Sequence, residues 1–189
     1  MFIQTEPTPN PASLKFLPGR SIMARGTADF PSPDTARSSP LAQRLFDVQG
    51  VRGVFLGSDF VTITKIDGTE WSLLKPAVLG ALAEHFLSGD AVVHERPVGE
   101  GAENEEDEED ADAEGIVRRI RELLDTRVRP AVARDGGDII FRAFRDGVVY
   151  LRLQGSCSGC PSSTATLKNG IENLLQHYIP EVLAVRAVD

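Results

Sequence analysis

The sequence contains few cysteines and few histidines. Its 189 residues include two cysteines, Cys157 and Cys160, and three histidines, His85, His94 and His177. A secreted domain held together by disulfides would normally use more cysteines at this length. No histidine lies at the spacing from the cysteines that a four-ligand structural zinc site would use. The composition therefore argues against a disulfide scaffold and an internal zinc site, and the two cysteines are interpreted as a pair.

Long apolar runs are also missing. The richest stretch, 76–87, is interrupted by Glu84 and His85, so it falls short of the ~18 apolar residues that a membrane-spanning helix needs. The first residues show neither a basic segment followed by an apolar one nor an Arg-rich amphipathic pattern, which mark secretory and mitochondrial leaders. We therefore expect no membrane association and a cytoplasmic location in a bacterium, or the mitochondrial matrix if the chain is a processed form.

Positive charge is absent from one segment of the chain. Ten of the 28 acidic residues fall within 100–114, where no Lys or Arg occurs. Residues 1–99 have a net charge of -1 and residues 115–189 a net charge of +3, so the overall charge of -8 comes mainly from this segment. Like charges with hardly any apolar side chain cannot bury enough surface to offset the entropy of ordering. We predict a flexible, disordered acidic linker at 98–114 between two domains, at 1–97 and 115–189.

Both domains are predicted to be small α+β domains. In the first, strands are expected at 2–5 and 14–17 and a hairpin at 54–65. Helices are expected at 40–48 and from Trp71 to just before Gly89, where apolar residues recur at three- and four-residue intervals. We interpret the Trp and Phe positions of the longer helix as core packing.

The second domain is expected to have the order αββαβ. Its predicted elements are a helix over 116–128 that ends near Pro130, a hairpin of strands 139–144 and 148–153, a helix that begins at Pro161, and a last strand over 182–188. This order is typical of a layer of helices packed on a small sheet.

The segment 155–161 has the composition of a ligand site. Cys157 and Cys160 are spaced C-x-x-C, which lets both sulfurs turn toward one metal centre from a single loop, and the flanking glycines let backbone N–H groups approach the sulfurs. The predicted helix N-terminus places partial positive charge beside the sulfurs, so we expect thiolate to be favoured over thiol.

Three interpretations of this cysteine pair are considered. A thioredoxin-like redox pair expects a parallel βαβ setting, whereas the preceding elements look like an antiparallel hairpin, so it ranks second. Two inert buried cysteines are disfavoured because a Ser/Gly-rich loop offers little apolar cover. An iron–sulfur cluster usually takes four thiolates, so two copies related by a two-fold axis would complete the site. A cluster at such an interface suits a protein that hands its cluster on.

Several short motifs together resemble those of a known family. In the second half they are Arg129-Pro130, Asp135-Gly136-Gly137-Asp138, Leu151-Arg152-Leu153-Gln154-Gly155 and Cys157-Ser158-Gly159-Cys160-Pro161-Ser162-Ser163. In the first half they are Phe2-Ile3-Gln4-Thr5-Glu6, Thr8-Pro9-Asn10-Pro11, Leu14-Lys15-Phe16 and Gly53-Val54-Phe55. On these motifs the sequence resembles the Nfu family of iron–sulfur cluster scaffold and carrier proteins, which is related to the C-terminal domain of NifU.

The resemblance implies a function without conventional enzymatic turnover. Cys157 and Cys160 would ligate a [4Fe–4S] cluster shared between two subunits, although four thiolates also hold a [2Fe–2S] centre. The cluster would come from upstream assembly machinery and go to apo iron–sulfur proteins such as aconitase and lipoyl synthase, with the N-terminal domain aiding partner contact. The protein is expected to be a homodimer when loaded and largely monomeric when empty.

The arginines of the second domain are a weak signal for nucleic acid, because a net charge of +3 without interleaved aromatics is small, and no nucleic acid partner is expected. A milder hypothesis is that Arg142, Arg145 and Arg152 stabilise the anionic cluster or meet an acidic client.

Overall fold

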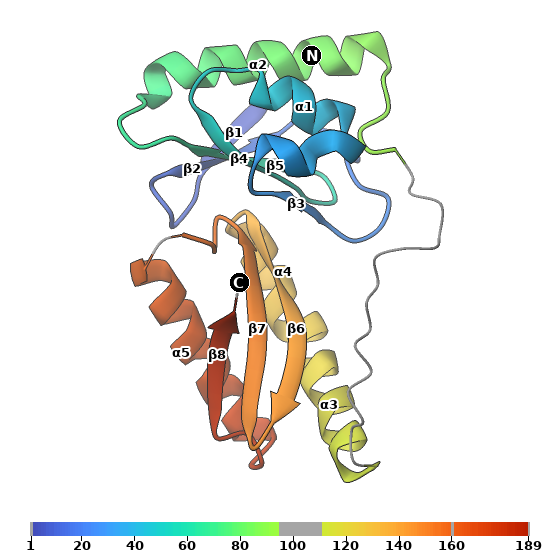
Figure 1. Cartoon of the computed structure of the whole chain (residues 1–189), viewed down its shortest axis with the longest axis vertical. Helices are drawn as coiled ribbons and strands as arrows, with labels where there is room; N and C mark the ends of the chain where they lie inside the picture. The colour runs from blue at the N-terminus through green and yellow to red at the C-terminus, as the bar shows by residue number, and fades with distance from the viewer. Residues whose placement is uncertain (1, 95–110, 160, 189) are drawn as a thin grey trace. The chain divides into compact units, whose positions relative to one another are not determined.

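The computed structural model describes residues 2–94, 111–159 and 161–188. The chain divides into two compact units, Met1–Gly99 and Glu100–Asp189, and each has its own hydrophobic core (Figure 1). Both units combine helices with a sheet, so the predicted α+β class in two domains is confirmed. No helix among the described residues is long and apolar enough to cross a membrane.

The N-terminal unit is a five-stranded antiparallel sheet with helices on one side (Figure 1). Its strands are β1 Gln4–Pro7, β2 Ser13–Leu17, β3 Ala28–Phe30, β4 Val51–Leu56 and β5 Val61–Lys65, in the order β1-β2-β5-β4-β3. Its helices are the 3₁₀ helix η1 Pro33–Ser38, α1 Pro40–Phe46 and α2 Trp71–Ser88. The sequence did not predict β3 or η1, because a three-residue strand and two turns of 3₁₀ helix are too short to give a periodic pattern.

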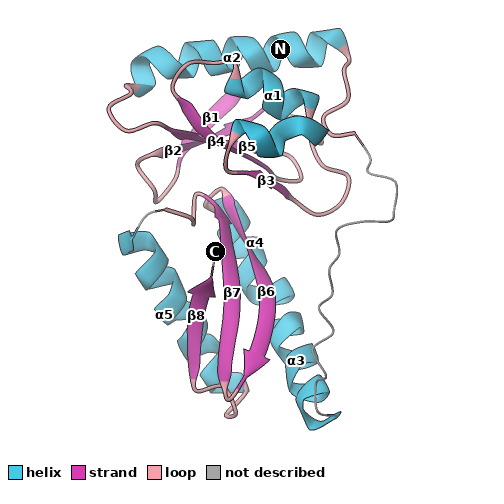
Figure 2. Ribbon diagram, in the orientation of Figure 1, coloured by secondary structure: helices cyan, strands magenta, loops and turns pink. Residues whose placement is uncertain are grey.

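The C-terminal unit is a three-stranded sheet with helices behind it (Figure 2). Its helical elements are α3 Ala111–Leu123, the π-helical turn η2 Leu124–Val128, α4 Arg129–Arg134 and α5 Pro161–Tyr178. Its strands are β6 Gly137–Arg145, β7 Val148–Gly155 and β8 Ala184–Val188. β7 pairs antiparallel with β6 and parallel with β8.

The prediction that the first helix of this unit ends near Pro130 is wrong. The helical path continues through η2 into α4, and Pro130 occupies a first-turn position of α4. A proline is tolerated in this first turn because its missing N–H removes no hydrogen bond between residues of α4 itself. The π-helical turn just before it changes the hydrogen-bond pattern, so the helix passes the proline and ends at the turn that leads to β6.

The start of α3 overlaps the predicted linker. The helix begins at Ala111, so residues 111–114 are helical rather than disordered. Residues 98–110 of the predicted linker lie outside the described residues, and the flexibility of this segment stays a prediction.

Candidate functional site

Cys157 lies in the loop that connects β7 to α5. Its side chain is 7% exposed and belongs to the hydrophobic core of the C-terminal unit. The sequence argument that a Ser/Gly-rich loop leaves its cysteines without apolar cover is therefore wrong for Cys157. Its partner in the motif, Cys160, lies outside the described residues, and its role as a ligand stays a prediction.

The loop is fixed on both sides by hydrogen bonds. The hydroxyl of Thr164, in the first turns of α5, donates to the backbone oxygen of Cys157 at 3.1 Å. The backbone N–H and the hydroxyl of Ser158 both donate to the oxygen of Gly155, at 3.2 and 2.9 Å. The end of β7, the cysteine and the start of α5 are thus held in one local arrangement.

A second turn, at residues 135–137, packs against the cysteine loop. The hydroxyl of Ser156 donates to the backbone oxygen of Asp135 at 2.5 Å, and its N–H donates to the oxygen of Gly136 at 3.2 Å. Gly137 approaches so closely that a Cβ atom on it would lie 2.6 Å from Sγ of Cys157 and 2.7 Å from the backbone oxygen of Gln154. Only a glycine fits there, and its backbone forms one wall of the sulfur's surroundings.

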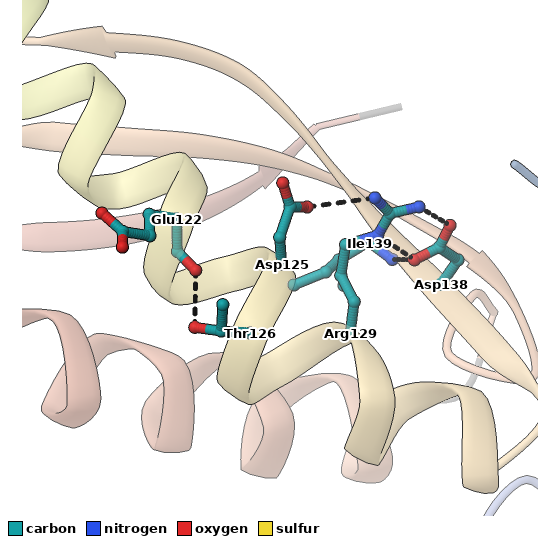
Figure 3. Close-up of polar contacts among 6 residues, drawn as sticks. All are labelled: Glu122, Asp125, Thr126, Arg129, Asp138 and Ile139. Carbon is teal, nitrogen blue, oxygen red and sulfur yellow. Dashed lines mark hydrogen bonds and ion pairs between the residues drawn. The ribbon is translucent and has the colours of Figure 1, made fainter.

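An ion pair holds this turn to the helices (Figure 3). Arg129 donates from Nε and Nη2 to the two carboxylate oxygens of Asp138, both at 2.8 Å, and from Nη1 to Asp125 at 3.0 Å. The Asp138 side chain is 5% exposed, and it also accepts the N–H of Ile139 at 2.8 Å. These contacts raise the pKa of Arg129, with burial opposing them, so the guanidinium stays charged. We call Asp125, Arg129 and Asp138 the arginine clamp.

The prediction that thiolate is favoured is wrong for Cys157. Burial raises the pKa of the thiol from its ordinary value of 9.0 to about 11. The hydrogen bond with Ser156 lowers it, whereas the carboxylates of Asp135 and Asp138 raise it. The free sulfur is therefore protonated at neutral pH, and binding of a metal there must release a proton.

The sequence motifs contained the clamp residues without revealing their role. Arg129 and Asp138 were part of the motifs quoted above, but their contact spans a helix end and a turn. One signal was available in the sequence. Asp138 directly precedes the apolar run 139–141, and a carboxylate buried beside such a run requires a positively charged partner. Ser156 and Thr164 gave no such signal, because serine and threonine are common in loops.

The histidines do not contribute to this site. His85 is fully buried on α2 of the N-terminal unit, and His177 is exposed on α5. Within the described residues, no group of three or more His, Cys, Asp or Glu side chains is placed to hold a metal ion.

Both halves of the chain match known families. A family model described as "Scaffold protein Nfu/NifU N terminal" matches residues 3–89, and one described as "NifU-like domain" matches residues 120–186. The chain belongs to the Nfu family. Among family members, the "NFU1 iron-sulfur cluster scaffold homolog, mitochondrial" of Homo sapiens is 52% identical over 190 residues, covering 100% of this chain and 72% of that protein.

Two further relatives extend this comparison. The protein of the same name in Drosophila erecta is 55% identical over 189 residues, and the match covers 100% of this chain and 65% of that protein. A NifU-like protein from Saccharomyces cerevisiae, known in solution structure, is 27% identical with a TM-score of 0.46, over 50% of this chain and 86% of its own. The names of the fly and human family members include "mitochondrial". This agrees with the predicted matrix alternative and gives the cytoplasmic prediction no support.

Proposed function

We propose that this chain is an iron–sulfur cluster scaffold and carrier. Cys157 and Cys160 of two copies together hold a [4Fe–4S] cluster, or a [2Fe–2S] cluster, and the protein passes it to apo iron–sulfur proteins. The observation that carries the proposal is the position of the C-x-x-C pair within the NifU-like domain of a chain whose relatives are named cluster scaffolds. These names favour an assembly role over catalytic turnover.

The number of sulfur ligands supports a shared site. The chain has two cysteines, whereas a cluster usually takes four thiolates. A two-fold axis that brings two cysteine loops together supplies the remaining ligands. The N-terminal domain, 1–97, then serves partner contact, and the acidic segment 98–114 tethers it to the cluster-binding domain, 115–189. Apo forms of aconitase-like and lipoyl-synthase-like proteins are the proposed clients, and upstream assembly machinery supplies the cluster.

The burial of Cys157 is consistent with a site that releases its cluster. When the cluster binds, Sγ of Cys157 loses its proton and forms a bond to iron. During transfer, a client thiolate forms a bond to the same iron, the bond to Cys157 breaks, and the displaced thiolate takes up a proton, with no change in oxidation state. Because burial raises the pKa of this thiol to about 11, the displaced sulfur is protonated at neutral pH and recaptures the iron less readily.

A dithiol oxidoreductase is the second candidate, and one observation favours it. β7, α5 and β8 form a parallel βαβ unit around the motif, the setting that the sequence prediction found missing. However, a redox-active cysteine needs an accessible thiolate with a lowered pKa. Cys157 is buried and its pKa is raised, so the carrier function remains the first candidate.

Anaerobic reconstitution with iron and sulfide distinguishes the two candidates. For the carrier we expect a stable cluster with about two cysteines per chain and four per site, together with a doubling of mass by light scattering. Cys157→Ser and Cys160→Ser should abolish cluster binding, whereas Ala165→Ser, at an exposed position of α5, should retain it. A chain that forms no stable cluster but reduces protein disulfides would overturn the proposal.

A further inference from the structure

The sheet of the C-terminal unit has one face that its own unit does not cover. On the other face, the side chains of Ile139, Leu151 and Val185 share one core cluster with Ile120 and Leu175 of the helices. Figure 2 shows α3, α4 and α5 on the same side of the sheet. No described element of this unit lies across the opposite side.

Strand register identifies the residues of the uncovered face. Because neighbouring side chains along a strand point to opposite faces, Tyr150 and Arg152 lie opposite to the buried Leu151. Arg152 pairs with Ile140 on β6 and with Val188 on β8, and Tyr150 pairs with Arg186 on β8. Arg142 has no pairing partner at the register irregularity between Phe141 and Ala143, but it is exposed and directly follows Phe141, which packs against the core, so its side chain lies on the uncovered side. We call the set Ile140, Arg142, Tyr150, Arg152, Arg186 and Val188 the open sheet face.

The open sheet face is positively charged. Three of its six residues are arginines, at 142, 152 and 186, and none is acidic, while the three strands contain a single acidic residue, Asp138. The carboxylate of Asp138 is buried and bonded to Arg129, so it does not offset this charge. A surface with this composition attracts anionic partners.

A second copy of the chain is a poor occupant for this face. A two-fold interface brings the same patch of both subunits together. Docking the open sheet face on itself would place arginines against arginines, which is unfavourable. The complementary partner is a different surface that carries carboxylates. Two exposed arginines and the half-buried Arg152, beside Tyr150, Ile140 and Val188, have the composition of a protein-binding patch, since interface contacts are enriched in Tyr and Arg.

The open sheet face leads directly to the cysteine loop. β7 continues from Arg152 through Gly155 into Ser156 and Cys157. β6 starts at Gly137, where an added Cβ atom would lie 2.6 Å from Sγ of Cys157. At about 3.3 Å per strand residue, Arg152 lies about 17 Å along the chain from Cys157. A protein bound on this face is therefore held within reach of the cargo site.

We propose that the open sheet face docks an acidic surface of the protein that receives the cluster. The inference rests on the proposed carrier function and adds to it where the recipient binds and by what chemistry. Electrostatic attraction of this kind acts mainly on the rate of encounter, so it assists delivery without holding the recipient afterwards.

The experiment uses the full chain and a short, fluorescent poly-L-glutamate peptide as the probe. Arg142→Glu/Arg186→Glu should weaken peptide binding, followed by fluorescence anisotropy, by about 10-fold or more at low ionic strength. The loss should shrink between about 10 mM and about 150 mM salt, where the Debye length falls from about 30 to about 8 Å. The conservative Arg142→Lys/Arg186→Lys pair should bind like the unmodified chain.

The matched control is Arg118→Glu/Arg127→Glu, which makes the same charge change on exposed positions of α3 and η2. This control should leave peptide binding within about two-fold, because the altered charges lie on the helical layer, away from the open sheet face. Equal weakening by both pairs would mean that only net charge matters and would overturn the proposal.

Cluster transfer to apo-aconitase supplies the second readout. The loaded Arg142→Glu/Arg186→Glu chain should keep its iron and sulfide content and its maximal transfer rate but need a higher recipient concentration. Cys157→Ser should behave in the opposite way, losing the cluster while binding the peptide normally. Loss of cluster in the Cys157→Ser chain alone therefore tests the proposed function, and loss of peptide binding in the arginine pair alone tests the docking face.

The same assay tests two other possible ligands of the open sheet face. Tighter binding of a single-stranded oligonucleotide than of poly-L-glutamate of equal length would overturn the protein partner in favour of nucleic acid. A chain lacking residues 101–110 reports on the protein's own acidic segment. If this chain binds the peptide while the full chain does not, the acidic segment is the occupant and the proposal is wrong.

Discussion

The two units bury polar groups in different ways. In the N-terminal unit, His85 is fully buried on α2, and neither of its ring nitrogens has a hydrogen-bond partner among the described residues. In the C-terminal unit, Asp138 is also buried, but both of its carboxylate oxygens accept hydrogen bonds from Arg129. An unpaired buried polar group costs stability, whereas a paired one fixes geometry.

The difference shows that the surroundings of His85 mainly stabilise the fold, whereas those of Cys157 also fix the geometry of a site. Around His85 the unit is stabilised by its apolar core, and the histidine could be replaced by an apolar side chain. Around Cys157, by contrast, a chain of polar contacts runs from Asp125 through Arg129 and Asp138 to the turn at Gly137. Substitutions around Cys157 should therefore disturb both the site and the stability of the C-terminal unit, whereas those at His85 should change stability alone.

The largest effect is expected from Gly137→Ala. The new Cβ atom would lie 2.7 Å from the backbone oxygen of Gln154, which cannot rotate away, and 2.6 Å from Sγ of Cys157. We expect a loss of about 3 kcal/mol in the free energy of unfolding of the C-terminal unit, by chemical denaturation. Gly170→Ala is the matched control, because it meets nothing within 4 Å on α5. It should stabilise by about 0.5–1 kcal/mol; equal loss in both variants would refute the close contact.

Breaking the arginine clamp should have the next largest effect. Arg129→Met leaves the carboxylate of Asp138 buried without its bidentate partner, although Arg129 itself is 38% exposed, which moderates the loss. We expect destabilisation by about 2 kcal/mol, measured by urea unfolding. Arg118→Met, at an exposed position of α3, should change stability by less than about 0.5 kcal/mol. If the two methionine variants unfold alike, the clamp does not stabilise the turn.

Much of the fold followed from local patterns. The hairpin of β6 and β7 was predicted from two strand-like runs joined at Asp146 and Gly147, and both residues have the positive φ angles, 49° and 76°, that such a turn requires. The start of α5 at Pro161 followed from the preference of proline for the first helical turn. These signals are contained within a few neighbouring residues, so a single sequence suffices to read them.

What the sequence did not reveal depends on contacts between distant residues. The burial of Cys157 is provided in part by Gly137, twenty residues earlier, and no local pattern shows that a turn will cover a Ser/Gly-rich loop. The same holds for the path of the helix past Pro130. The two cysteines were identified as a pair by spacing alone, but the protonation state of Cys157 depends on tertiary burial.

The titration of Cys157 gives a pH test of that burial. The pKa of this thiol is raised from 9.0 to about 11 in the folded chain. Between pH 9 and pH 11 the thiol is therefore ionised in the unfolded chain but still protonated in the folded chain, which favours unfolding. The contribution is fully present below pH 9 and is lost as pH rises toward 11, by up to about 2 kcal/mol. Cluster-free protein should therefore unfold more easily over this range, and Cys157→Ala should reduce the slope. An unchanged slope would indicate that the thiol is not desolvated.

The smallest effect is expected from His85→Phe. Burial lowers the pKa of His85 from its ordinary value of 6.5, the charge of Arg44 lowers it further, and Asp90 opposes them. The imidazole of the unfolded chain therefore binds a proton at a higher pH than that of the folded chain, so the N-terminal unit loses stability as pH falls below about 6.5. The phenylalanine removes two unpaired ring nitrogens and should stabilise the unit by about 1 kcal/mol at neutral pH, with a larger gain in acid. His177→Phe, at an exposed position, should show neither gain in the same thermal unfolding series. A His85→Phe chain that is equally acid-sensitive would mean that other groups set the acid limit, and the contrast between the two units would then reduce to the clamp alone.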